Sequence, residues 1–80
     1  MEEKEKRLPG FLRRLIKEKA KLQEKQDALV CFIENNPIFD TLPEEEQKRM
    51  FRQSNLHEEL LGVLDDRILF HLGNLEEQGE

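Results

Sequence analysis

The sequence predicts an all-α fold, an antiparallel hairpin of two long helices, and three observations support this prediction. Charged residues make up 39% of the 80-residue chain and apolar residues 36%, a balance typical of long helices with solvated outer faces. Leucines recur at intervals of seven over residues 8–29. Pro37 and Pro43 cannot both lie within one continuous helix, because each lacks an N–H group and clashes with the preceding turn. The chain is therefore expected to reverse between them.

The first helix is expected over residues 9–35, after a charged and flexible N-terminal segment, residues 1–7. Proline is acceptable in the first turn of a helix, and a residue that precedes proline avoids the helical region, which sets the two ends. The leucines define a heptad pattern whose companion position is occupied by Lys19 and Gln26 in the middle of the helix. Polar residues at such positions lower stability but can fix the register and oligomeric state of coiled coils.

A connection over residues 36–41 is expected to lead into a second helix over residues 42–72. Thr41 and Glu44 have the spacing of a capping box, so Thr41 is predicted to be the N-cap of this helix. The glutamates that follow Pro43 favour a helix start, because the helix dipole stabilises negative charge in the first turn. These features together predict a hairpin spanning residues 8–74.

The second helix is predicted to end at a glycine C-cap, Gly73, followed by an acidic tail over residues 75–80. The chain carries a net charge of −5, but residues 1–25 contain nine lysines and arginines against five acidic residues. A turn near Phe39 would place residue n opposite residue 78 − n and bring the basic first helix beside acidic Asp65 and Asp66. This match of charge favours antiparallel pairing.

A hairpin of this size buries one stripe of each helix, and a second apolar stripe would favour self-association. The sequence therefore predicts a homo-oligomer, most simply a dimer that forms a helical bundle. The residues predicted to form this core and oligomer stripe are Leu15, Leu22, Leu29, Ile33, Phe39, Leu61, Leu64 and Ile68.

The residues of the chain do not point to an enzyme, and no cofactor or metal is expected. His57 and His71 lie fourteen residues apart, whereas a helical metal site needs ligands about one turn apart, so both are interpreted as interface histidines. Cys31 lies in an apolar run and is predicted to pack as a small hydrophobic side chain at an interface. A single cysteine, no secretory signal and no apolar run of ~20 residues predict a cytoplasmic protein without a membrane span.

The candidate binding residues are cations on the first helix. Arg13, Lys17 and Lys21 follow one another at intervals of four and share a helix face, which Arg14 flanks. This arrangement could contact phosphates of a nucleotide, or it could be a solvated face paired with acidic residues. A sequence pI of about 5.1 argues against nucleic acid as a partner.

One pattern covers about two-thirds of the chain, from Ile16 to Ile68. A charged helix is followed by the apolar-to-Asn run of residues 29–36, the segment 39–47 and the segment 63–68. In this pattern the chain resembles a family of short helical proteins of bacteriophages and prophages that is named after crAss-like phages. The resemblance implies a phage protein acting in the host cytoplasm, in a family without an assigned activity.

Three functions are compatible with that setting. The favoured hypothesis is a non-enzymatic accessory protein that binds a host or anti-phage-defence protein stoichiometrically through its helical faces. The alternative is an oligomeric sponge that sequesters an anionic nucleotide signal on the basic stripe. A component of the virion or of its assembly is the third hypothesis.

Overall fold

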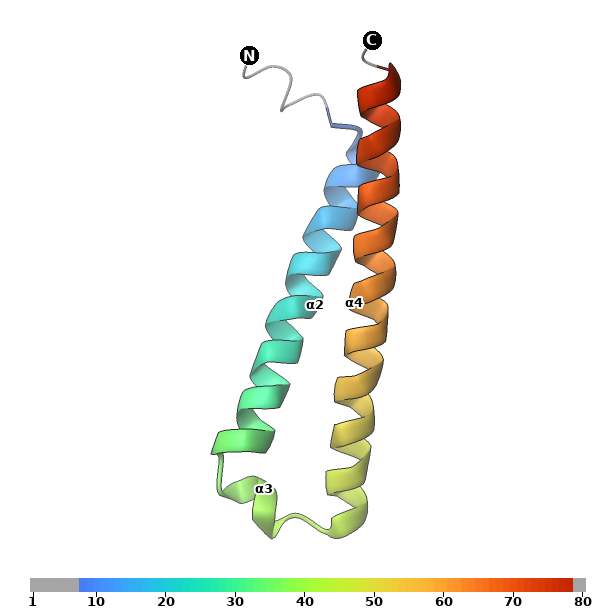
Figure 1. Ribbon diagram of the computed structural model, residues 1–80. Helices are drawn as coiled ribbons and strands as arrows, with labels where there is room; N and C mark the ends of the chain where they lie inside the picture. Colours follow the sequence, from blue (N-terminus) through green and yellow to red (C-terminus); the bar gives the residue numbers. More distant parts are fainter. Residues whose placement is uncertain (1–7, 79–80) are drawn as a thin grey trace.

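The computed structural model describes residues 8–78 and shows an all-α hairpin, which confirms the predicted fold class (Figure 1). Helix α2 spans Gly10–Asn35, the short helix α3 spans Ile38–Thr41, and helix α4 spans Glu44–Gln78. The helices α2 and α4 run antiparallel and pack against each other, with α3 at the closed end of the hairpin (Figure 1). The molecule is a rod with extents of 57 × 20 × 16 Å. The predicted N-terminal segment, residues 1–7, lies outside the described residues.

Prolines delimit α2 at both ends. Pro9 is the N-cap, and its carbonyl oxygen accepts hydrogen bonds from the backbone N–H groups of Leu12 and Arg13, both at 3.0 Å. At the other end Asn36 is extended, with φ −97° and ψ 118°, because Pro37 follows it. The fixed geometry of proline thus explains why the helix occupies the stretch between these two positions.

The connection contains a helical turn that the sequence did not predict. Thr41 was expected to cap the second helix, but it is the last residue of α3, and its Oγ1 donates to the carbonyl oxygen of Ile38 at 2.6 Å. The second helix begins instead at Glu44, directly after Pro43, whose carbonyl oxygen accepts from the backbone N–H of Gln47 at 3.0 Å. The capping prediction is therefore wrong, because the threonine hydroxyl is already bonded within α3.

The side chain of Gln47 holds α3 against the first turn of α4. Its Nε2 donates to the carbonyl oxygens of Phe39 at 2.9 Å and Leu42 at 3.1 Å. The ring of Phe39 is buried and lies edge-on to Phe32 and Phe51, with centroid distances of 6.4 and 5.5 Å. Apolar packing and two hydrogen bonds thus close the end of the hairpin.

Helix α4 is longer than predicted. It passes through Gly73 and continues to Gln78, whereas the sequence predicted an end near Leu72 and an acidic tail over residues 75–80. No residue of the described chain has a positive φ angle, so Gly73 does not form the left-handed C-cap that was expected. Leu75 packs against the core, which extends the apolar contact of α4 beyond the glycine.

The core is one stripe along the contact between α2 and α4. Its centre consists of Leu12, Leu15, Leu64 and Ile68, and Leu12 is 0% exposed. Of the predicted stripe, Leu15, Phe39, Leu61, Leu64 and Ile68 are buried, while Leu22, Leu29 and Ile33 are half-buried.

The register of the two helices differs from the predicted one. Lys19 donates to Asp65, with Nζ and Oδ1 2.9 Å apart, whereas the predicted register of n opposite 78 − n placed Arg13 opposite Asp65. The physical reason lies at the closed end, where Gln47 binds α3, so the first turn of α4 faces α3 rather than the end of α2. The helix α2 is therefore displaced along α4 by more than one turn relative to the prediction.

Candidate anion-binding groove

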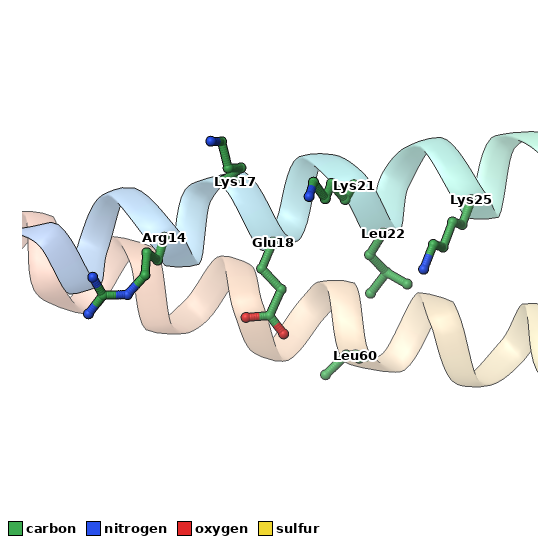
Figure 2. Close-up of a pocket in the computed structure, with 7 residues that line it drawn as sticks. All are labelled: Arg14, Lys17, Glu18, Lys21, Leu22, Lys25 and Leu60. Carbon is green, nitrogen blue, oxygen red and sulfur yellow. The ribbon is translucent and has the colours of Figure 1, made fainter.

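Four cations of α2 border a groove between the two long helices. The groove has a volume of about 430 Å³, and we call it the basic groove (Figure 2). Its lining residues are Arg14, Lys17, Glu18, Lys21, Leu22 and Lys25 from α2 and Leu60 from α4. Intervals of three and four residues place most of these α2 side chains on the edge of the helix that borders α4.

The basic groove combines an apolar floor with charged walls. Figure 2 shows Arg14, Glu18 and Leu22 reaching from α2 toward α4, while Lys17 projects away from α4. Leu22 is half-buried and packs against the core, and Leu60 is 44% exposed. Guanidinium and ammonium groups are strong donors to phosphate or carboxylate oxygens, and the leucines offer apolar contact to the body of a ligand. The groove is therefore suited to a small anion that also has an apolar part.

A second hollow continues the basic surface toward the start of α2. It has a volume of about 410 Å³ and is lined by Gly10, Arg13, Arg14 and Lys17. The four predicted anion-binding residues therefore do not all line one hollow. Arg14 and Lys17 line both hollows, whereas Arg13 lines only this one and Lys21 lines only the basic groove.

Two members of the basic groove were outside the predicted set of binding residues. Lys25 could have been included, because it lies one turn after Lys21 and continues the same edge of the helix. Leu60 could not have been found from the pattern of one helix. Its place in the groove depends on the register between α2 and α4, which differs from the predicted one.

A cluster of polar side chains around the buried Gln26 lies at the middle of the helix pair. Gln26 is 2% exposed, and its Nε2 donates to Ser54 Oγ and to Glu58 Oε2, both at 2.9 Å. Its Oε1 lies 3.0 Å from Nδ1 of His57. Because an amide oxygen only accepts, His57 carries a proton on Nδ1 in this arrangement. The four side chains join α2 to α4 at one defined register and are called the polar layer below.

The two histidines contact other side chains and do not form a metal site with each other. His57 belongs to the polar layer, and the ring of His71 lies edge-on to Phe11 and Phe70, with centroid distances of 4.8 and 5.2 Å. In the described part of the chain, no group of three histidine, cysteine or acidic side chains could hold a metal ion.

The hairpin itself does not bury Cys31, and its packing at an interface stays a prediction. Cys31 is exposed, and its Sγ accepts a long hydrogen bond from Asn35 Nδ2 at 3.6 Å. The apolar run around it covers more than one face of the helix, and its neighbours Val30 and Phe32 are half-buried whereas Cys31 is exposed. The cysteine falls on the face that α4 does not reach.

An exposed row of apolar side chains borders the basic groove on α4. Leu56, Leu60, Val63 and Phe70 are 52%, 44%, 52% and 64% exposed, and we call them the apolar row. Leu60 belongs to both features, so the row adjoins the groove at this residue.

Charged residues interrupt both long helices, and no helix within residues 8–78 has the length and apolarity needed to cross a membrane.

Comparison with known proteins relates the chain to one family. No curated protein and no solved structure shows a significant match. A model of the Sequestin family matches residues 9–70, which include α2, α3 and most of α4. This match contains every residue of the basic groove and of the polar layer. Because it covers more than half of the sequence, the chain belongs to the Sequestin family.

Proposed function

We propose that the protein sequesters an anionic small molecule, a phosphate-bearing nucleotide, in the basic groove. The observation that carries this proposal is that four cations and two leucines line one hollow of about 430 Å³. The family name Sequestin points to a molecule that is held rather than converted. Of the functions compatible with the sequence, the nucleotide sponge agrees best with these two observations.

The charges of the basic groove favour a ligand with more than one negative charge. Arg14, Lys17, Lys21 and Lys25 outnumber the single carboxylate of Glu18. Arginine can bind two phosphate oxygens at once, and the lysines act as mobile point charges. Leu22 and Leu60 provide an apolar surface for the face of a nucleobase, and the volume is within the range of small-molecule sites.

Sequestration requires no chemical step. The free concentration of a ligand falls when the binding protein is in excess and its Kd is below the ligand concentration. A small, abundant protein can therefore silence a nucleotide signal by stoichiometric binding. The sequence resembles a family of phage proteins. In a phage-infected cell the ligand would be a signalling nucleotide of host defence in the host cytoplasm.

The charge-reversing change Lys21→Glu is expected to weaken nucleotide binding at least tenfold, which is about 1.4 kcal/mol of binding free energy. It replaces an attraction with a repulsion at the centre of the basic groove. The measurement is isothermal titration calorimetry with pyrophosphate, mononucleotides and cyclic dinucleotides. The expected result for the wild type is saturable binding of at least one nucleotide.

The matched control is Lys48→Glu, which makes the same change of charge in the first turns of α4, outside the residues that line the groove. Lys48 is 74% exposed and lies 3.9 Å from Glu44, so this variant should fold and bind as the wild type does. The proposed function would be contradicted if the wild type bound no nucleotide, or if the wild type and Lys21→Glu bound it with equal affinity.

A second candidate function rests on the apolar row. Four large apolar side chains, each at least 44% exposed, form the kind of surface that binds another helix. Under this alternative the protein binds a host or defence protein through the row. Affinity capture with the wild type and with a row variant, Val63→Asp, tests it, because specific capture should disappear in the variant.

A further inference from the structure

We infer that the apolar row is covered by a second copy of this chain, so that two hairpins pair through their α4 helices. The pairing itself does not depend on the proposed function. One consequence, that the second copy forms a wall of the nucleotide-binding groove, rests on the proposed function.

The row has the spacing of a helix-packing seam. Leu56, Leu60 and Val63 follow intervals of four and three residues, and Phe70 continues the pattern seven residues later. At 1.5 Å per residue the row is about 21 Å long. Arg67 occupies the position between Val63 and Phe70. A partner helix that packs along this row must therefore offer both apolar contact and a nearby acidic group.

The edges of the row have opposite charges. The edge toward α2 borders the basic groove, which Leu60 lines together with Lys21 and Lys25. Glu59 and Asp66 each precede a row position by one residue, which places both on the edge away from α2. The face thus changes from basic through apolar to acidic across its width.

This order of charges makes the face complementary to itself. A two-fold rotation about an axis that runs parallel to α4 between the two copies exchanges the edges, so the acidic edge of one copy meets the basic edge of the other. Each residue then lies at the level of the same residue of the second copy, which places the second copy's Asp66 on the same side as Arg67. The apolar middle meets itself. A second copy of the chain therefore supplies the complementary charges with its own residues.

The small core also favours a permanent partner. Six apolar side chains are buried in the described hairpin, which is a rod only 16 Å thick in its smallest dimension. A domain of this size gains little stability from a single core, and oligomerisation is a usual remedy. A second copy is present wherever the chain is made, so it can cover the row as soon as the hairpin forms.

Pairing would also complete the basic groove. The second α4 would lie beside Leu60 and form a wall on the side where the groove is open to solvent. It would bring Glu59 and Asp66 of the second copy to the rim, where carboxylates can accept hydrogen bonds from ribose hydroxyl groups. The four cations still outnumber Glu18 and these two carboxylates, so the completed groove still attracts an anion.

The change Val63→Asp tests the pairing, because it places a charge at the centre of the row on a side chain that is 52% exposed. Light scattering should give about twice the chain mass of 9.6 kDa for the wild type and the single-chain mass for Val63→Asp. The control is Leu69→Asp, a change of similar chemistry at a side chain that is 59% exposed on a different face of α4. It should keep the mass of the wild type, and circular dichroism should show equal helicity in all three proteins.

A monomeric wild type would overturn the inference and leave the row open for another protein. An associated wild type whose mass Val63→Asp does not lower would overturn it as well, because a different face would then hold the copies together. The outcome for the proposed function is separate. A dimer that binds no nucleotide supports the pairing and contradicts sequestration, whereas a monomer that binds one does the reverse.

Discussion

Replacing Leu64 with alanine is expected to remove most of the helical structure at 25 °C. Leu64 is 1% exposed and packs in the central cluster with Leu12, Leu15 and Ile68. A buried leucine-to-alanine change destabilises by about 2–5 kcal/mol, since transfer free energy is lost and a cavity remains. A single core of this size supplies only about 3–5 kcal/mol of net stability. The expected loss of stability is therefore about as large as the whole free energy of unfolding.

Thermal melts followed by circular dichroism at 222 nm measure this effect. Leu69→Ala provides the control, because that side chain lies on the same helix but is 59% exposed, so its stability should change by no more than about 0.5 kcal/mol. If Leu64→Ala melted at the temperature of the wild type, the contact between α2 and α4 would not be the core of the fold.

Replacing Gln26 with alanine is expected to destabilise the hairpin by about 2 kcal/mol, the second-largest effect. The change removes the amide that bonds to Ser54, His57 and Glu58 in the polar layer. It also opens a space in the helix contact, since Gln26 is only 2% exposed. The partially exposed partners regain hydrogen bonds to water, which keeps the effect below the sum of three lost bonds.

Chemical denaturation of Gln23→Ala is the matched comparison. Gln23 lies almost one turn earlier in the same helix, and its side chain donates to Asp27, also in α2, at 3.0 Å on the exposed face. Its replacement should shift stability by less than about 0.5 kcal/mol. Equal effects of the two substitutions would mean that the polar layer contributes nothing specific to the fold.

The ends of α2 follow from local chemistry, which is why the sequence could predict them. Pro9 and Pro37 act on their immediate neighbours, and their effect does not depend on distant residues. The heptad leucines likewise indicated the face of α2 that meets α4, because helical periodicity alone determines which side chains share a face. The predicted polar positions Lys19 and Gln26 do lie on that face, where both bond to α4.

The other differences arise from contacts between segments. Thr41 has the spacing of an N-cap, but its hydroxyl bonds within α3, and Gln47 then holds α3 at the level of the first turn of α4. These contacts set the register of the hairpin, which local propensity does not encode. The extension of α4 past Gly73 has a similar origin, because the packing of Leu75 outweighs the weak helix propensity of glycine.

The parts of the candidate site that depend on one helix could be predicted, and the parts that depend on the packing of two helices could not. The spacing of Arg13, Lys17 and Lys21 identified the basic face of α2, since it depends on one helix only. The basic groove also needs Leu60, whose position depends on the register between helices. The exposure of Cys31 depends on which faces α4 leaves uncovered, and composition alone does not determine this.

The central claim is that the basic groove binds an anionic nucleotide, and amide chemical shifts test it most directly. The measurement is a titration of the ¹⁵N-labelled protein with the nucleotide that gives the strongest calorimetric signal, or with each member of the panel in turn. The account predicts saturable shifts concentrated in residues 14–25 and at Leu60, with little change in α3. The absence of saturable shifts, or shifts concentrated around α3 instead, would contradict it.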